Sequence, residues 1–322
     1  MTEAPVAVAG SSRGRGWRRY RTSTFYLFAS PWILGFLVLT LMPVVYTFGV
    51  SLTNYDGYSP LWRWVGFRNY IEVLTADPGA LASMGRSVVF AAVVVPLTVA
   101  LGTALALLVN RRLKARGVWR AIFFLPSVVP VVATAIMFRL IFNRDAGLLN
   151  YIMGFFTDAK ITWLADPYAF YVLILMMLWG VGGGMIIILA ALQDVPVEIE
   201  EAARIDGASY WRIVRSIILP LISPVLYFQV ITGVIGSLQI LVQPMLLAET
   251  SSIATSASVP SSTTLLMVDV YNEFFYNQRF GYGSAMLWLF FIIILTLTLV
   301  LQRLSKRFVF YQVESGTDTD KG

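Results

Sequence analysis

Two of the side chains that most often do chemistry in proteins, the thiol of cysteine and the imidazole of histidine, are missing from this sequence. The 322 residues include no cysteine and no histidine. This composition excludes thiolate nucleophiles, disulfides, and catalytic triads or zinc sites that need histidine. The candidate ligand contacts within or directly beside the apolar stretches are an indole, hydroxyls and amides, which stack on a ligand or hydrogen-bond to it. They belong to Trp179, Gln229, Thr232, Ser237, Gln239 and Gln243.

A polar segment, residues 194–213, interrupts the apolar pattern and has the features of two short helices joined by a turn. Pro196 suits the first turn of a helix, where its missing N–H is not needed. The residues that follow it are acidic, which favours the positive end of the helix dipole. They are Glu198, Glu200 and Glu201. Gly207 is placed where a helix ends in a left-handed conformation, and Ser209 can cap a second helix.

Small side chains share one face of the first of these predicted helices. Ile199, Ala202 and Ala203 occupy positions i, i+3 and i+4. Two alanines at these positions leave a flat surface that a partner can approach closely. The residues alone do not identify that partner.

Long apolar stretches must position these polar groups. The chain is 57% hydrophobic and 13% charged, whereas soluble domains carry about 25% charged residues. A membrane span needs roughly 20 apolar residues to cross about 30 Å of hydrocarbon. Stretches that satisfy this requirement lie at 25–50, 87–109, 121–142, 169–192, 218–242 and 284–302. The sequence therefore predicts an all-α membrane protein with six transmembrane helices, the first too long to be a cleaved signal peptide.

Several of these stretches contain prolines, which can bend a helix, or glycines, which let two helices approach closely. Prolines are tolerated in spans when neighbouring helices satisfy the freed backbone carbonyls. The prolines are Pro31, Pro43, Pro96, Pro126, Pro130 and Pro224. Glycines within the fourth stretch permit close helix packing. They are Gly180, Gly182, Gly183 and Gly184.

The basic residues concentrate in alternate connections between the stretches. The rich segments hold Arg13, Arg15, Arg18, Arg19 and Arg21; Arg111, Arg112, Lys114, Arg116 and Arg120; Arg204, Arg212 and Arg215; and Arg303, Lys306, Arg307 and Lys321. The poor segments hold Arg63, Arg68, Arg86, Arg144, Lys160 and Arg279. The positive-inside rule then predicts that both termini are cytoplasmic. Arg139 lies near the outer end of the third stretch, where it either extends its charge to the interface or has a functional role.

These patterns divide the chain into three parts. Residues 1–24 form a basic cytoplasmic N-terminal segment, residues 25–302 the six-span domain, and residues 303–322 a cytoplasmic tail. The net charge of +6 is explained by the Lys and Arg residues of the rich connections, which a membrane protein carries on one side of the bilayer. We therefore expect contact with membrane lipid and no nucleic acid partner.

One motif within the connection 193–217 has a recognisable spacing. Glu201-Ala202-Ala203 is followed by Gly207 and then by Ile217-Ile218-Leu219-Pro220. This segment resembles the EAA loop of binding-protein-dependent ABC importer permeases. The pattern of that family is EAA, any three residues, G, any nine residues, I, any residue, and LP, and every specified position matches.

Further segments resemble the sugar-permease branch of the family, the maltose- and glycerol-phosphate-type permeases. They occur in the expected order and are Gly66-Phe67-Arg68-Asn69-Tyr70, Trp163-Leu164-Ala165-Asp166-Pro167 and Phe280-Gly281-Tyr282-Gly283-Ser284-Ala285. Residues 249–263 depart from the family pattern, because they are rich in Ser, Thr and Ala where many members have a Gly-Gly-Pro turn.

The resemblance implies a type I ABC importer permease fold in a bacterial inner membrane, with half of a translocation path contributed by this chain. It implies a second homologous permease subunit, two ATPase subunits or domains, and an extracytoplasmic solute-binding protein. The chain has no GxxxxGK[ST] loop. We therefore expect a transport subunit that is not itself an enzyme and binds no cofactor or metal, with ATP and Mg held by the partner ATPase.

The resemblance also implies roles for individual residues. The alanine-faced helix becomes a coupling helix seated in a groove of the ATPase, through Glu201, Ala202, Ala203 and Gly207, with Asp206 as a supporting polar contact. The cargo is expected to be a mono- or oligosaccharide, and the six polar side chains within the spans are candidate substrate contacts. Interhelical packing and hydrogen bonding are the alternative role for each of them.

Other functions remain open at this point. A stand-alone secondary transporter usually needs more spans or an inverted repeat, and often intramembrane carboxylates. No Asp or Glu lies within the six stretches, which counts against proton coupling. A membrane enzyme is disfavoured, because the chain has no His or Cys and no clustered carboxylates within the stretches. A purely structural or receptor subunit is disfavoured, because it would not need the coupling motif. A permease for a non-sugar such as glycerol phosphate stays an alternative.

Overall fold

The computed structural model describes residues 22–111, 114–248 and 259–308. Within these ranges the regular structure is helical, apart from one isolated antiparallel bridge between Thr53 and Trp64. Most of the predicted basic N-terminal segment, the tail beyond Phe308 and residues 249–258 of the Ser- and Thr-rich loop lie outside the described residues. The chain forms two units, which meet in the sequence between Gly49 and Val50.

The described part of the first unit is the predicted first span. It consists of α1 (Thr22–Phe36), the π-helical turn η1 (Leu37–Leu41) and the beginning of α2 (Met42–Ser51). Residues Phe25–Ser51 form a helix that is long and apolar enough to cross a membrane. Pro43, which has no N–H to donate, is the second residue of α2, one residue after Met42, which ends the π-helical turn.

Two spans of the second unit are single helices that extend past the predicted limits. They are α4 (Pro78–Asn110) and α16 (Phe280–Phe308), whereas the sequence predicted spans at 87–109 and 284–302. Helix α4 begins early because Asp77 accepts hydrogen bonds from the backbone N–H groups of Gly79 and Ala80, and Pro78 occupies the first turn. Helix α16 continues into the segment predicted as a tail.

The other three spans of the second unit are pairs of helices separated by a bend. The pair α5 (Arg116–Val128) and α6 (Val131–Ile141) bends by 95°. Pro130 follows the break and holds the preceding Val129 in an extended conformation. The pair α8 (Ala169–Trp179) and α9 (Gly182–Gln193) bends by 43° at the predicted glycine cluster.

The fifth span is the most strongly segmented. Helix α11 (Tyr210–Ile213), the π-helical turn η2 (Val214–Ile218) and α12 (Leu219–Leu221) precede α13 (Ser223–Leu238), with a 68° bend. Pro220 and Pro224 flank the break at Ile222. Counting each bent pair as one span gives up to six within the part of the chain that the structure describes, which agrees with the predicted number.

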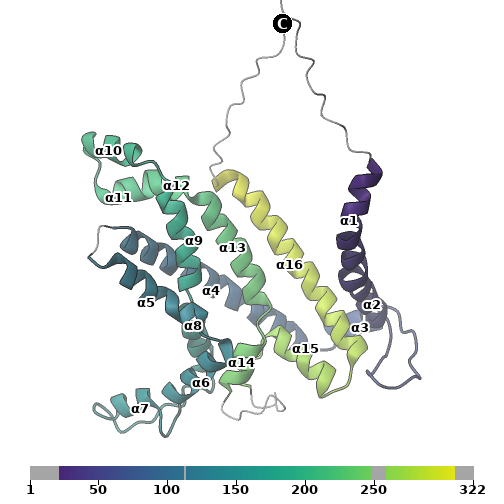
Figure 1. Ribbon diagram of the computed structural model, residues 1–322. Coiled ribbons are helices and arrows are strands. Elements are labelled where there is room, and N and C mark those ends of the chain that lie inside the picture. Colours follow the sequence, from purple (N-terminus) through teal and green to yellow (C-terminus); the bar gives the residue numbers. More distant parts are fainter. Residues whose placement is uncertain (1–21, 112–113, 249–258, 309–322) are drawn as a thin grey trace, which may run out of the picture. The chain divides into compact units, whose positions relative to one another are not determined.

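Short elements connect the spans. On one side are α10 (Val197–Ile205) and α11. On the other side are α3 (Arg68–Thr75), α7 (Leu148–Met153), α14 (Val242–Leu247), the 3-10 turn η4 (Ser261–Thr263) and α15 (Leu266–Phe275). Figure 1 shows α10 and α11 together at one end of the second unit, with α7, α14 and α15 toward the other end.

Helix α4 is the centre of the second unit and packs against α9, α13, α8, α15 and α3. The core follows it in three clusters. One surrounds Met185 and Ile218 beside α10 and α11, one surrounds Phe90 and Leu173, and one surrounds Leu238 and Met286. Close packing by the glycine cluster is confirmed at Gly182, where an added Cβ would collide with the carbonyl oxygen of Phe123 on α5.

Candidate functional site

The predicted helix–turn–helix is present as α10, a tight turn and α11, and we call residues 197–213 the coupling hairpin. Helix α10 begins after Pro196, and its first turn holds the acidic residues Glu198 and Glu200. Arg204 in its last turn pairs with Glu200 at 3.5 Å. Both placements complement the helix dipole, so the sequence of α10 favours this short helix in this position.

The turn after α10 has the hydrogen bonds of a Schellman motif. The Ala208 N–H donates to the Ala203 carbonyl oxygen at 2.9 Å, and the Gly207 N–H donates to the Arg204 carbonyl oxygen at 3.0 Å. Gly207 has a φ of +79°, which is the left-handed conformation that the sequence predicted for it. An added Cβ at Gly207 would meet no atom within 4 Å, so the need for glycine is conformational rather than steric.

Helix α11 returns the chain to the membrane. Ser209 occupies the residue before α11 with an extended backbone, but its side chain makes no capping hydrogen bond. The predicted capping by the Ser209 hydroxyl is therefore wrong, although the helix begins where it was expected. The guanidinium of Arg111 at the end of α4 lies 4.4 Å from the ring centre of Tyr210, and Ile213 is buried in the core.

The predicted coupling residues do not all face the same way. Glu201, Ala202, Asp206 and Gly207 are exposed. Ala203 is half-buried and packs against the core cluster that contains Met185 and Ile218. The structure thus places Ala202, but not Ala203, fully on the outward face, whereas the sequence analysis assigned both alanines to it.

Two large apolar side chains of the coupling hairpin were missed by sequence reasoning. Ile205 is 86% exposed and Trp211 is 72% exposed. Ile205 lies three residues beyond Ala202 and four beyond Glu201, so all three share the outward face of α10. The spacing of Ile205 from Ala202 in the sequence already places it on this face.

A cavity of about 690 Å³ separates the coupling hairpin from the end of α4 and the start of α5. Arg111, Arg116, Glu200 and Tyr210 are among the residues that line it. The hairpin is therefore attached to the bundle through α11 and through Ala203 of α10, and part of α10 faces the cavity instead.

The candidate substrate contacts on α13 fall on different sides of that helix. Thr232 and Gln239 are exposed, and they share a face with exposed Phe228 and Gly236. Ser237 is buried, and its hydroxyl donates to the Val234 carbonyl oxygen at 3.1 Å. We call residues 228, 232, 236 and 239 the open face of α13. Thr232 and Gln239 are thus accessible to a ligand, whereas Ser237 is not.

Gln229 borders the open face but is engaged with a neighbouring helix. Its side-chain amide donates to the Gly184 carbonyl oxygen of α9 at 3.0 Å. This contact is the interhelical hydrogen bonding that the sequence analysis gave as the alternative role.

The other two candidates lie on other elements. Trp179 ends α8 and is partly exposed, with its ring edge-to-face against Phe138 of α6 at a centroid distance of 6.5 Å. Gln243 is half-buried in the first turn of α14. The six predicted side chains therefore do not form one compact pocket within this chain.

At the end of the second unit opposite the coupling hairpin, charged groups join segments distant in sequence. Arg279 pairs with both Glu72 of α3 and Glu273 of α15, and the Tyr282 hydroxyl donates to Asp77 at 2.6 Å. Burial raises the pKa of Glu273 above its usual value. These contacts join α3 and α15 to Arg279, the residue before α16, and join α16 to Asp77, the residue before α4.

A second polar contact at this end joins two loops. Asp166 accepts hydrogen bonds from the Ser261 N–H at 2.9 Å, the Ser261 hydroxyl at 2.8 Å and the Ser262 N–H at 3.0 Å. Burial alone would raise the pKa of Asp166, but the hydrogen bonds from Ser262 and Ser261 hold it below its usual value. Asp166 therefore caps the turn η4 as a carboxylate.

Comparison with known proteins identifies the class. The family model described as the binding-protein-dependent transport system inner membrane component matches residues 97–310, which include the coupling hairpin. The chain belongs to this family, as the EAA-type motif predicted.

Individual relatives cover nearly the whole chain. The probable ABC transporter permease protein YesP of Bacillus subtilis is 32% identical, with 89% of this chain and 92% of the relative covered. The trehalose/maltose transport system permease protein MalF of Thermococcus litoralis is 34% identical, with 88% and 94% covered.

A solved structure confirms the predicted fold. It is a bacterial alginate ABC transporter in complex with an alginate pentasaccharide-bound periplasmic protein. One of its chains matches with a TM-score of 0.75 at 17% identity, covering 88% of this chain and 94% of that one. The chain therefore has the type I ABC permease fold.

Proposed function

We propose that this chain is one transmembrane permease subunit of an ATP-driven, binding-protein-dependent importer for a carbohydrate. The observation that supports this function best is the coupling hairpin. It combines the family's motif with a rigid turn and an outward face that the described chain does not cover. A face with Ala202 beside exposed Ile205 suits a protein groove, because burial of an apolar side chain by a partner lowers the free energy of the complex.

The partner at this face is the separate ATPase. It binds ATP and Mg, since this chain has no phosphate-binding loop, and this chain binds no cofactor. When ATP closes the ATPase pair, the coupling hairpin moves with it. The hairpin continues through α11, η2 and α12 into α13, so its displacement is passed to the open face of α13. The equilibrium between inward- and outward-facing states then shifts with the nucleotide state.

The proposal that the cargo is a carbohydrate rests on the relatives. MalF of Thermococcus litoralis is a trehalose/maltose permease, and the structural neighbour belongs to an alginate transporter. Hydroxyl and amide groups on the open face of α13, from Thr232 and Gln239, suit the hydroxyl groups of a sugar. A second homologous permease subunit faces this open side and completes the path.

The remaining partners follow from the same proposal. A solute-binding protein delivers the sugar at the end of the second unit that holds α3, α7 and α15. The termini and the coupling hairpin lie on the cytoplasmic side of a bacterial inner membrane, where most of the Lys and Arg residues lie.

The test is purification of the tagged chain from its native membrane in mild detergent, followed by reconstitution of the complex in vesicles. We expect an ATPase and a second six-span protein to co-purify, and ATP to drive uptake of trehalose, maltose or a related sugar. Ala202→Asp should remove the ATPase and leave the chain in the membrane. A chain that purifies alone and transports sugar without ATP would overturn the proposal.

A further inference from the structure

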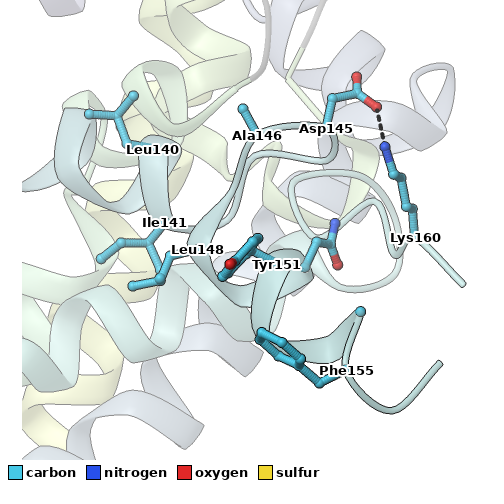
Figure 2. A pocket seen from close by; sticks show the side chains of 10 residues that line it. Leu140, Ile141, Asp145, Ala146, Leu148, Tyr151, Phe155 and Lys160 are labelled. Carbon is cyan, nitrogen blue, oxygen red and sulfur yellow. Dashed lines mark ion pairs between the residues drawn. The ribbon is translucent and has the colours of Figure 1, made fainter. Parts of the chain in front are cut away.

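Large apolar side chains are exposed at two places on the end of the second unit opposite the coupling hairpin. One place is α7, where Tyr151 and Phe155 are exposed and line a mainly apolar cavity of about 640 Å³. Figure 2 shows these two side chains along one side of the loop and the ion pair of Asp145 with Lys160 on the other. The other place is the connection that leads from the first span to α3, and we call its residues 58–67 the aromatic loop.

The aromatic loop exposes side chains that are large and apolar. They are Tyr58, Leu61, Trp62, Trp64 and Phe67. Leu61 is 84% exposed. A cluster of this kind marks a surface that another apolar body covers.

The backbone of the aromatic loop is fixed by hydrogen bonds to the segment that precedes it. The Asn54 N–H donates to the Arg63 carbonyl oxygen at 3.0 Å. The Leu52 carbonyl oxygen accepts from the Val65 N–H at 2.8 Å and from the Gly66 N–H at 3.1 Å. These bonds satisfy polar backbone groups within the chain, which a loop needs where it enters an apolar environment. The outward direction of the large side chains is therefore built into the fold.

The segment before the aromatic loop is attached to the start of a membrane span. The Tyr55 carbonyl oxygen accepts from the Gly281 N–H in the first turn of α16 at 2.9 Å, and the rings of Tyr55 and Phe280 lie 6.1 Å apart. Gly57 has a φ of +97°, and an added Cβ there would collide with the Phe280 ring. In the sequence, the loop also follows closely after Ser51, the last residue of the first span. The loop is therefore held at the level where spans leave the hydrocarbon.

The charges of this segment suit lipid headgroups. Residues 57–71 include Arg63 and Arg68 but no Asp or Glu. Asp56, directly before them, accepts a hydrogen bond from the Tyr58 N–H at 3.2 Å. An exposed arginine beside aromatic rings can extend its guanidinium to a headgroup phosphate while the rings stay near the ends of the acyl chains.

We propose that the aromatic loop lies in the membrane interface and anchors the start of α16 to the lipid. Trp62 and Trp64 each combine a large apolar ring with one N–H group, which favours the level of the headgroups. Lipid covers this surface because the loop follows one span and holds the first turn of another. The exposed Tyr151 ring of α7, at the same end of the unit, fits the same interface. This anchor is independent of the cargo and of the ATPase.

The test places one thiol in the aromatic loop of the full-length chain, which has no native cysteine. Leu61→Cys is labelled with an environment-sensitive fluorophore, and the chain with its co-purifying subunits is reconstituted in vesicles of phosphatidylcholine and phosphatidylglycerol. Lipids brominated near the top of their acyl chains should remove most of the fluorescence, and aqueous iodide should remove little. Glu198→Cys, at an exposed position in the first turn of α10, is the control and should show the reverse. Iodide quenching at Leu61→Cys as complete as at the control would overturn the proposal.

Further outcomes separate lipid from a protein partner. A fluorophore at residue 61 that is shielded from both quenchers would assign the surface to a partner subunit. Fluorescence that brominated lipid leaves unchanged, but that shifts when the solute-binding protein is added, would assign it to that protein. Either result would overturn the lipid anchor.

The role of the rings is tested in the same labelled chain. Trp62→Ser with Trp64→Ser should lower quenching by brominated lipid and raise quenching by iodide, because both side chains are exposed and their loss leaves the backbone bonds in place. Trp62→Phe with Trp64→Phe is the matched control and should keep most of the quenching by lipid, because the apolar rings remain. No difference between the two double variants would overturn anchoring by these rings.

Discussion

The Ala208 N–H donates to the Ala203 carbonyl oxygen at 2.9 Å, across the turn that contains Gly207. This bond closes α10 and fixes the direction in which α11 leaves it. The two helices therefore keep a defined angle only while Gly207 stays in its left-handed conformation, with φ at +79°.

Gly207→Ala should loosen this turn. The left-handed conformation costs a non-glycine residue about 1–2 kcal/mol, and no steric clash adds to this cost. We expect ATP-dependent uptake to fall severalfold while membrane insertion stays normal. Gly117→Ala is the matched control, because its Cβ also meets no atom within 4 Å and its φ is not in the left-handed region. Equal uptake in both variants would remove the turn from the coupling mechanism.

Ile205→Asp should prevent docking of the ATPase. The change replaces an 86% exposed apolar side chain with a carboxylate, so it leaves the fold of the chain intact and removes an anchor that the partner buries. Central apolar anchors contribute about 2 kcal/mol or more to an interface, so the recovered ATPase should fall tenfold or more in a pull-down. Leu61→Asp, which changes an equally exposed leucine outside the hairpin, should retain the ATPase. The docking assignment fails if Ile205→Asp retains it as well.

We expect Gln229 to contribute to the stability of the fold and Gln239 to contribute to sugar binding. Gln229→Met removes the hydrogen bond to the Gly184 carbonyl oxygen and should lower stability by about 1 kcal/mol. Gln239→Met changes an exposed residue of the open face of α13, so it should raise the KM for sugar and leave the unfolding temperature unchanged. Uptake kinetics and thermal unfolding of both variants measure the distinction, and the reverse pattern would exchange the two roles.

Asp166→Asn should destabilise the contact between two outer loops in a pH-dependent way. The pKa of Asp166 is below its usual value in the folded protein, so its carboxylate stabilises the fold above the unfolded pKa of about 3.9. That contribution is lost as the pH falls through the lower, folded pKa. We expect a lower unfolding temperature for the variant at pH 7 and a shrinking difference below about pH 4. Asp158→Asn, an exposed carboxylate nearby in sequence, should match the wild type at every pH.

The sequence predicted elements well where the information is local. Apolar length located all six spans, and the residue type at Gly207 predicted a turn that the structure describes as a Schellman motif. Helix α4 begins earlier than its apolar stretch because Asp77 caps it, and this start was readable from Asp77 and Pro78.

Features that depend on neighbours were not predictable in the same way. The inward position of Ala203 depends on the core cluster at the base of the hairpin, because periodicity defines a face but not what covers it. The pairing of Asp166 with Ser261 joins residues 95 positions apart. The 95° bend after α5 also could not be deduced, since a proline permits a break without setting its angle.

The breaks in three of the spans affect where water can reach the membrane-embedded part of the chain. Each interruption, near Val129, Gly180 and Ile222, ends one helix before the next begins. At two of them Pro130 and Pro224 have no N–H to donate to a backbone carbonyl of the preceding turn. In hydrocarbon such groups are stable only against protein or in a hydrated space. The breaks are therefore points where hydration can enter the depth of the bilayer. Since the chain has no native cysteine, single introduced thiols can map that water without background labelling.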